Sequence, residues 1–244
     1  MNSTPRDTIY ASQHDKVDGF SFDKRVVSVF PDMISRSVPG YVTAIAMLPS
    51  LADLYLQRDT QVYDLGCSLG ASTLAVAQVA SSRNCNIVGI DNSAAMLEKC
   101  QQLVDQSGFA SAIELRCGDL VNASYENASM AIMNYTLQFV AVEQRLELLK
   151  GLQKALLPGG VLILSEKITF PDPQINQDMI NLHQAFKREN GYSELEISQK
   201  RAALENILIP EQYSAHQERL QQAGFSRVEV ICQTLNFCTM LAIK

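Results

Sequence analysis

The stretch VYDLGCSLGAST, residues 62–73, holds the residues of this sequence that are best suited to binding a ligand. Gly66 and Gly70 lie four positions apart, between an apolar run and a helical run. A loop between a strand and a helix directs backbone N–H groups and the positive end of the helix at a ligand. Gly66 permits a positive φ or close backbone approach, and Gly70 lets the helix pack tightly on the strand. Taken alone, the two glycines also fit a plain tight turn.

Ser68 stands at the midpoint of this loop, where many such loops carry a third glycine. The dinucleotide fingerprint G-x-G-x-x-G needs room there for a pyrophosphate. The sequence therefore favours a ligand without a pyrophosphate, and S-adenosylmethionine is such a ligand. We interpret the adjacent Cys67 as a small neutral filler rather than a nucleophile, because the sequence places no base near it.

Three further polar positions follow predicted strands. Asp91 comes 21 residues after Gly70, where a carboxylate accepts hydrogen bonds from ribose hydroxyls, or alternatively serves as a charge at a helix N-terminus. Asp119, followed by Leu120, could accept from an adenine amino group, and the Asn134 amide points into the same crevice. Ligands of open α/β sheets bind at the carboxyl ends of the strands, so these positions together predict an adenosyl ligand.

Arg201 is the most unusual cation of the chain. On its predicted helix, Ile197, Leu204 and Leu208 share a face and Arg201 falls in the middle of it. An unpaired buried guanidinium is unfavourable, so the side chain needs an anion or a route to solvent. It could form an exposed pair with Glu205 or extend to solvent at the helix edge. If the face borders the cofactor cleft, a carboxylate should lie between Arg201 and the sulfonium, held by the planar guanidinium.

Alternating strand and helix patterns position these residues. Five strands are expected at residues 62–65 and in NIVGID, AIELRCGD, MAIMNYT and VLILSEK, with helices between them. Such repeats imply a parallel sheet wrapped by helices on both faces. After Gly224, two β-rich runs broken near residues 233–236 predict a hairpin at a sheet edge. The expected fold is α/β: a Rossmann-like, doubly wound, mostly parallel seven-stranded sheet with an antiparallel C-terminal hairpin, as in class I methyltransferases.

We expect residues 1–244 to form one domain with two additions to this core. Residues 1–57 comprise a polar, loosely held arm over 1–20 and then short helices punctuated by prolines at Pro31, Pro39 and Pro49. Residues 170–222 form a helical insertion followed by the last crossover helix. The insertion carries an apolar stripe flanked by His183, and a capping box of Ser193 with Glu196. We interpret His183 as a histidine at the edge of a core.

Composition excludes several classes of protein. The 244-residue chain has a net charge of −6, which disfavours direct nucleic-acid binding. Its six cysteines form no CxxC pair, and its three histidines (14, 183 and 216) are scattered, so no metal site is expected. The N-terminus lacks a signal-peptide pattern, and no apolar run approaches the ~18 residues of a membrane span. We therefore expect a cytoplasmic protein with free thiols.

Six segments together closely resemble the carboxy-S-adenosylmethionine synthases, bacterial enzymes of tRNA wobble-uridine modification: FPDMISRSVPGY, VYDLGCSLGAST, GIDNS, NYTLQF, LSEK and FKRENGYSELEISQKRAALEN. The likeness spans nearly the whole chain. It implies conversion of S-adenosylmethionine and prephenate to carboxy-S-adenosylmethionine and phenylpyruvate. It also implies a homodimer, and a separate enzyme that uses the product to carboxymethylate tRNA. One departure is VICQTLNFC, which lacks aromatic residues that relatives carry there.

The resemblance also assigns roles to single residues. Gly66, Cys67 and Ser68 would line the methionine end of the cofactor, with Asn134 at its amino-acid portion. The resemblance also implies that Asp91 and Asn92 contact the ribose, and that Asp119 and Leu120 contact the adenine. It further implies that Tyr41 and Arg201 bind the new carboxylate.

Prephenate is a dianion, so basic residues should gather near the mouth of the site. Candidates are the pairs Lys187-Arg188 and Lys200-Arg201, together with Arg36, although Lys187, Arg188 and Lys200 also fit solvated surface charges. Three rival functions are also considered. They are a conventional S-adenosylmethionine-dependent small-molecule methyltransferase, a non-catalytic adenosyl-ligand sensor, and a nicotinamide oxidoreductase, which Ser68 and the terminal hairpin disfavour.

Overall fold

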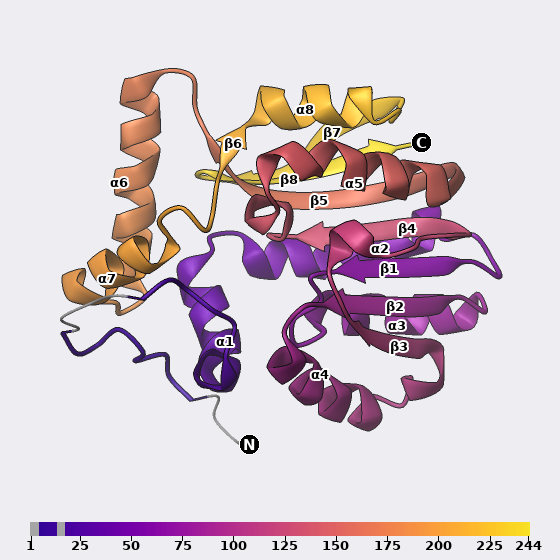
Figure 1. The fold of residues 1–244 in the computed structure, drawn as a ribbon, viewed down its shortest axis with the longest axis horizontal. Coiled ribbons are helices and arrows are strands. Elements are labelled where there is room, and N and C mark those ends of the chain that lie inside the picture. Colours follow the sequence, from indigo (N-terminus) through magenta and orange to yellow (C-terminus); the bar gives the residue numbers. More distant parts are fainter. Residues whose placement is uncertain (1–4, 14–17) are drawn as a thin grey trace.

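The computed structural model describes residues 5–13 and 18–244. These residues form one mixed sheet and the helices that surround it (Figure 1). The strand order is β3-β2-β1-β4-β5-β8-β7, and the short β6 pairs with β5 outside this path. Strands β1 to β5 pair in parallel, whereas β8 runs antiparallel to both β5 and β7. The strands are β1 (Gln61–Leu65), β2 (Asn86–Asp91), β3 (Ile113–Cys117), β4 (Ala128–Asn134), β5 (Leu156–Thr169), β6 (Glu211–Gln212), β7 (Arg227–Thr234) and β8 (Phe237–Ile243).

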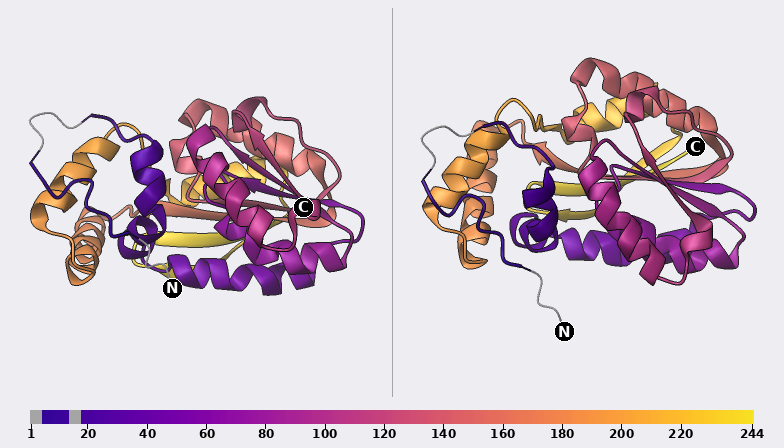
Figure 2. Two further views of the ribbon diagram at one scale, coloured as in Figure 1. Left: turned by 90° about the horizontal axis from the view of Figure 1, so that it is seen from below. Right: turned by 60° about the horizontal axis from the view of Figure 1, so that its bottom comes forward.

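Helices cover both faces of the sheet (Figure 2). Successive strand residues point to opposite faces, so Val62 packs towards α2 and α3 while Tyr63 belongs to the core under α5 and α8. The helices are α1 (Lys24–Ser37), α2 (Tyr41–Tyr55), α3 (Ala71–Ser82), α4 (Ala94–Gln106), α5 (Val142–Ala155), α6 (Pro173–Glu189), α7 (Glu194–Leu204) and α8 (Tyr213–Gln222), with short 3₁₀ turns η1 (Ala110–Ala112), η2 (Leu120–Asn122) and η3 (Leu137–Phe139). The expected class of fold, the seven main strands and the C-terminal hairpin are confirmed.

The N-terminal helices differ from the prediction. Helix α1 continues through Pro31 and α2 through Pro49, so the breaks predicted at these two prolines were wrong. A proline inside a helix removes one backbone donor. Here the surrounding apolar positions, such as the buried Met33 and Leu48, keep each helix packed on its neighbours. Only residues 38–40 interrupt the run.

Helices α6 and α7 form a lobe at one end of the sheet, and the N-terminal segment lies against it (Figure 1). The Phe20 N–H donates to the Ala203 carbonyl at 2.9 Å, and the Gln199 side chain donates to two carbonyls of the segment. The carboxylate of Asp7, which is buried, accepts from the Tyr192 hydroxyl at 2.7 Å. The described part of the arm is therefore held firmly, contrary to the loose arm expected, because it supplies hydrogen bonds to α7.

A buried carboxyl group on β5 ties this strand to the turn that follows β4. Glu166 is fully buried, and its Oε1 accepts from the Leu137 N–H at 2.9 Å. Its Oε2 has no hydrogen-bond partner among the described residues. Burial raises the pKa of Glu166 to about 8, although the positive charge of Arg145 opposes the shift.

This shift predicts a pH-dependent stability that Glu166→Gln should remove. Between the ordinary carboxyl pKa and about 8, the folded protein keeps a proton that the unfolded chain has lost. The free energy of unfolding should therefore fall as pH rises through this window, by up to about 1.4 kcal/mol per pH unit from this group. Urea unfolding of both proteins at pH 5.5, 6.5 and 7.5 measures the difference; parallel profiles would contradict the assignment.

Candidate functional site

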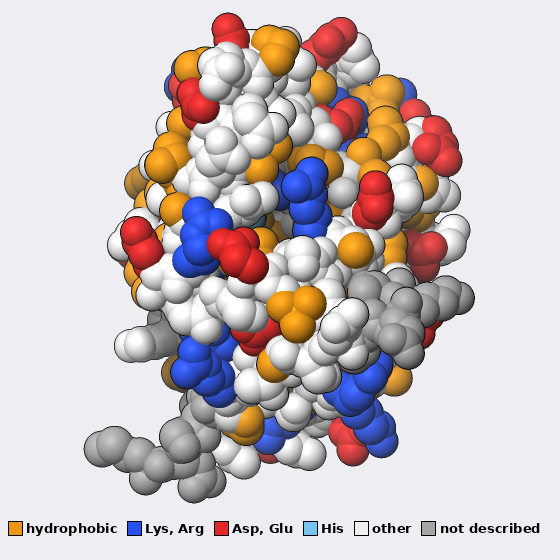
Figure 3. Space-filling model, turned by 90° about the vertical axis from the view of Figure 1, so that its left-hand side faces the viewer, with side chains coloured by type: hydrophobic (Ala, Val, Ile, Leu, Met, Phe, Trp, Pro, Cys, Tyr) orange, Lys and Arg blue, Asp and Glu red, His pale blue; other side chains and the backbone are white. Residues whose placement is uncertain are grey.

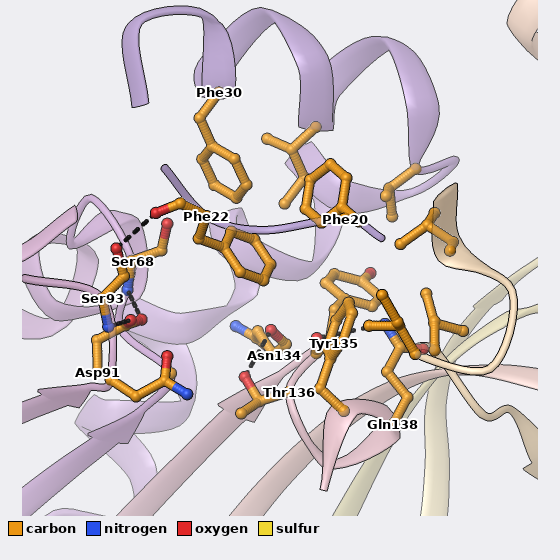
Figure 4. A pocket seen from close by; sticks show the side chains of 18 of the residues that line it. Phe20, Phe22, Phe30, Ser68, Asp91, Ser93, Asn134, Tyr135, Thr136 and Gln138 are labelled. Atoms are coloured by element: carbon orange, nitrogen blue, oxygen red, sulfur yellow. Dashed lines mark hydrogen bonds between the residues drawn. The ribbon is translucent and has the colours of Figure 1, made fainter. Parts of the chain in front are cut away.

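A large cavity lies at the carboxyl ends of the parallel strands (Figure 4). Its volume is about 1180 Å³, and its lining includes the turn after β1, the ends of β2 and β4, and side chains from α1, α6 and α7. Pockets for one small ligand usually measure ~300–1,000 Å³. The cavity is therefore large enough for an adenosyl ligand together with a second molecule.

The glycine turn needs both of its glycines. Gly66 has φ of +76° and Gly70 has φ of +80°, which disfavour side chains. A β-carbon at Gly66 would overlap the Thr136 side chain, and one at Gly70 would lie 2.7 Å from the Cys100 sulfur. Gly70 was predicted to let its helix pack tightly on the strand; the structure shows in addition that the sulfur of Cys100 on α4 leaves no room for a side chain here.

Two backbone donors orient the Asp91 carboxylate. Its Oδ2 accepts from the Ser68 N–H at 2.9 Å and its Oδ1 from the Ser93 N–H at 2.8 Å. Burial raises the pKa of Asp91, and these two hydrogen bonds oppose the rise. The carboxylate therefore joins the glycine turn to the start of α4 and faces the cavity between them (Figure 4). The two interpretations of Asp91, helix-terminal charge and ligand acceptor, are compatible in this geometry.

Asn134 and Asp119 are also fixed at strand ends. The Asn134 amide donates to Ser72 Oγ at 2.9 Å and accepts from Ser165 Oγ at 2.6 Å. The Asp119 carboxylate caps η2 by accepting from the Val121 N–H at 3.0 Å. Both side chains are therefore held in place before any ligand arrives.

Nine of the ten residues predicted to bind the cofactor line this one cavity: Tyr41, Gly66, Cys67, Ser68, Asp91, Asn92, Asp119, Leu120 and Asn134. The Cys67 thiol is buried, and hydrogen bonding to the Cys100 thiol and burial both raise its pKa. A thiol in this environment stays protonated, in line with the interpretation of Cys67 as a neutral filler.

Arg201 is the tenth residue, and it is exposed on α7 and absent from the cavity lining. The buried face of α7 instead carries Ile197, Lys200 and Ala203. The prediction that Arg201 lies in the middle of that face was wrong, because one position along a helix is a rotation of about 100°. Lys200 occupies the cavity-facing position.

Phenylalanines from the N-terminal segment and α1 form a roof over the cavity, a feature that the sequence reasoning missed (Figure 4). The rings of Phe20 and Phe22 lie 5.1 Å apart, and Phe22 also packs edge-on against Phe30 at 6.1 Å and Phe139 at 5.6 Å. The pair of phenylalanines in FSFDK, Phe20 and Phe22, could have indicated this roof from the sequence. An aromatic roof excludes water from the ligand.

Cations line the end of the cavity that borders α6 and α7. Lys187, which is half-buried, and Lys200, which is buried, both line the cavity, and Lys167 on β5, which the sequence reasoning did not single out, joins them. Burial lowers the pKa of Lys187 to about 7 and that of Lys200 to about 8. His183 lies beside them, and burial lowers its pKa to about 3, so its ring is neutral at physiological pH.

The other candidate cations are engaged elsewhere. Arg188 is exposed and pairs with Glu194 at 3.0 Å. Arg36 binds Asp32 at 2.6 Å, and its guanidinium lies 4.0 Å from the centre of the Tyr192 ring. Neither side chain lines the cavity.

Within residues 5–13 and 18–244, no group of three or more histidine, cysteine, aspartate or glutamate residues is arranged to hold a metal ion. His14 lies outside the described residues, and the two other histidines are buried in separate places. In the same part of the chain, every helix is too short or too polar to cross a membrane.

Comparison with known proteins identifies close relatives over the full length. A methyltransferase-domain family matches residues 62–160. Carboxy-S-adenosyl-L-methionine synthase from Trichlorobacter lovleyi is 51% identical over 240 residues, covering 98% of each chain. The synthase of the same name from Colwellia psychrerythraea is 47% identical over 244 residues, all of both chains, and that from Escherichia coli is 46% identical, covering 98% of this chain and 97% of the other.

Solved structures agree on the fold. A putative O-methyltransferase from Nostoc punctiforme superposes with a TM-score of 0.62 at 20% identity, over 91% of this chain and 60% of the other. Human N-acetylserotonin methyltransferase in complex with SAM gives 0.58 at 17% identity, over 91% of this chain and 55% of the other. This chain spans less than two thirds of those longer proteins, and the likeness establishes a class I methyltransferase fold.

The geometry of the turn predicts that Asp91→Asn weakens binding of S-adenosylhomocysteine. Removing the charge should cost about 1.5–3 kcal/mol of hydrogen bonding to the ribose, or roughly 10- to 150-fold in Kd. Isothermal titration calorimetry measures this, with Asp105→Asn on the exposed face of α4 as the matched control. An unchanged Kd in a variant of normal thermal stability would contradict the ribose contact.

Proposed function

The chain belongs to the family of carboxy-S-adenosyl-L-methionine synthases, and on that premise we propose that it converts S-adenosylmethionine and prephenate to carboxy-S-adenosylmethionine and phenylpyruvate. The observation that supports this reaction best is the two-ended cavity. Carboxylate and amide acceptors suited to an adenosyl group lie at one end, and cations suited to a dianion lie at the other. A conventional methyltransferase also needs a second site for its methyl acceptor, so it is the positive charge of this end that supports a dianionic second substrate.

The proposed chemistry balances without an added oxidant or base. Prephenate loses carbon dioxide and hydroxide as its ring becomes aromatic, leaving phenylpyruvate. The hydroxide removes a proton from the S-methyl group of S-adenosylmethionine, which gives water and a sulfonium ylide. The ylide carbon then forms a bond to the trapped carbon dioxide, giving the S-carboxymethyl product. What the protein must supply is proximity, exclusion of water and a cation for the new carboxylate.

In this proposal, the residues of the strand ends hold the adenosyl donor. Asp91 with Asn92 binds the ribose, Asp119 with Leu120 binds the adenine, and Asn134 with the glycine turn holds the methionine portion. Burial raises the pKa of Tyr41 to about 12, so its hydroxyl keeps its proton and can donate to the new carboxylate. The phenylalanine roof limits escape of carbon dioxide and entry of bulk water.

We propose that Arg201 makes the second contact with the new carboxylate, and that this arginine comes from a second copy of the chain. Arg201 is exposed and outside the lining of the cavity of its own subunit. On the neighbouring helix α6, Ile175 and Leu182 are 46% and 48% exposed. Hydrophobic side chains therefore lie on the surface of the α6–α7 lobe, among Lys and Arg side chains (Figure 3). Burying such a surface favours a homodimer in which α7 reaches the partner's cavity.

We further propose that a separate tRNA carboxymethyltransferase uses the product in the cytoplasm. The net charge of −6 disfavours direct binding of tRNA by this chain. All six cysteines are free thiols, as suits a reducing compartment.

Mass spectrometry of the products tests the reaction. Incubating the protein with S-adenosylmethionine and prephenate should give an adenosyl product heavier by one carboxyl group, together with phenylpyruvate, and neither should form without prephenate. A protein that binds S-adenosylmethionine but forms neither product would contradict the proposal. Transfer of an unmodified methyl group to a small molecule would support the conventional methyltransferase instead.

The role of Arg201 is tested by substitution and by mixing subunits. Arg201→Ala should lower kcat/KM about 100-fold or more, and Arg201→Lys should restore little, because one ammonium cannot replace a two-pronged contact. Arg116→Ala at the sheet edge is the matched control.

Mixing Arg201→Ala subunits with Asp91→Asn subunits should recover part of the activity, because one site of a mixed dimer then has an intact cavity and an intact arginine. No recovery, in dimers shown to exchange subunits, would place Arg201 in its own subunit's site.

A further inference from the structure

Three lysines from separate elements meet at the lobe end of the cavity: Lys167 on β5, Lys187 on α6 and Lys200 on α7. Lys200 Nζ lies 3.4 Å from Ser37 Oγ and 4.0 Å from the carboxylate of Asp7. Neither Lys167 nor Lys187 forms an ion pair with any described carboxylate. Lys167 and Lys187 are half-buried, and Lys200 is buried. Cations that are partly removed from water without an anionic partner are unfavourable, so this arrangement favours an anion from outside the chain.

The lysines act on one another electrostatically. Burial is the largest cause of the lowered pKa of Lys187, and the positive charges of Lys200 and Lys167 lower this pKa further. Burial lowers the pKa of Lys167, and the charge of Arg201 adds to that effect. Only Asp7, beside Lys200, raises a pKa within the cluster. A bound anion would reverse these shifts by stabilising the protonated amines.

His183 contributes no charge to this end of the cavity. Its Nε2 lies 2.8 Å from the Ser37 carbonyl oxygen, which can only accept, so Nε2 carries the proton. The ring packs edge-on against Phe237 at 4.9 Å between centres. The histidine therefore serves as a wall of the cavity and leaves charge recognition to the lysines.

An aromatic wall connects the lysines to the cofactor end. Phe237 lies 5.9 Å from the Tyr135 ring, and Tyr135 lies 6.2 Å from the Tyr41 ring beside the glycine turn. The cavity thus presents ring surfaces along its side and amines at its end. A ligand that matches both is an unsaturated six-membered ring carrying two carboxylates.

We propose that Lys167, Lys187 and Lys200 form the subsite that binds the carboxylates of the second substrate, a ring-bearing dianion whose ring lies on the aromatic wall. This inference rests on the proposed function and names the residues that recognise the carboxyl donor. The dianion then enters a cavity end with three amines, one of which is already partly neutralised by Asp7. The lysines bring the leaving carboxylate into the same enclosed space as the sulfonium.

Binding measurements test the subsite independently of turnover. The probe is prephenate, titrated into protein saturated with S-adenosylhomocysteine, for the wild type and for Lys167→Gln and Lys187→Gln. Each substitution should raise the Kd for prephenate about tenfold or more, the usual loss for one charge-assisted hydrogen bond. The Kd for S-adenosylhomocysteine should change less than twofold. Lys187→Arg, which keeps the charge, should retain most of the affinity, and the exposed Lys150→Gln on α5 is the control.

Two outcomes would overturn the subsite. Loss of S-adenosylhomocysteine affinity in the lysine variants would mean that the cluster binds the amino-acid carboxylate of the adenosyl ligand. Unchanged affinity for both ligands in folded variants would mean that the lysines recognise neither. The proposed function can be contradicted separately. If the wild-type protein binds prephenate through the lysines but forms no carboxylated product, the subsite is supported and the proposed reaction is contradicted.

Proton uptake provides a second readout that a purely structural role would not change. Because the pKa of Lys187 is lowered to about 7, this amine is mostly neutral at pH 8 and mostly protonated at pH 6. Binding of a dianion should therefore be accompanied by uptake of protons at pH 8 and of far fewer protons at pH 6. The titratable groups that face Lys187 are Lys167, Lys200 and the neutral His183. Calorimetry in buffers of different ionisation enthalpy measures this, and Lys187→Gln should reduce the uptake; equal uptake in both proteins would contradict the assignment.

Discussion

The balance of charge inside one enclosed cavity is the constraint on which the site depends. Three lysines line one end of the cavity, and the adenosyl donor of this enzyme family brings a positive sulfonium. The acidic groups at the other end, Asp91 and Asp119, lie at the strand ends where we propose that the adenosyl part binds. Burial lowers the pKa values of Lys187 and Lys200, and the charges of Lys200 and Lys167 lower that of Lys187 further, so protonated amines at this end are unfavourable without an incoming anion. In our proposal, the second substrate therefore completes the site electrostatically as well as chemically.

The fold separates these two tasks. The doubly wound sheet supplies the cofactor end through local devices: a glycine turn after β1, a carboxylate fixed by two N–H groups after β2, and an amide fixed by two hydroxyls after β4. The α6–α7 lobe supplies the cationic end, and the N-terminal segment joins the two by roofing the cavity and bonding to α7. In our proposal, a class I methyltransferase scaffold thereby gains a second binding site without altering its sheet.

The cofactor end could be predicted from the sequence because each device is local. The strand and helix pattern, the glycine turn, the Ser193 capping box and the polar positions at the strand ends follow from motifs a few residues long, whereas Tyr41 and Asn92 came only from the family resemblance. The cationic end could not, because β5, α6 and α7 are separate elements that meet only through tertiary packing. On α7, a shift of one position along the helix decides whether Lys200 or Arg201 points into the cavity. The pattern of apolar residues placed Arg201 on the cavity-facing side. The firm attachment of the arm depends on Asp7 and Gln199 meeting partners far away in the chain.

The most direct test of the account is a crystal structure of the protein with S-adenosylhomocysteine and prephenate bound together. The account predicts the adenosyl group at Asp91 and Asp119, and the prephenate carboxylates within hydrogen-bonding distance of the amines of Lys167, Lys187 or Lys200. A complex in which the prephenate carboxylates face solvent, or in which the amino-acid carboxylate of S-adenosylhomocysteine occupies the lysines, would contradict it.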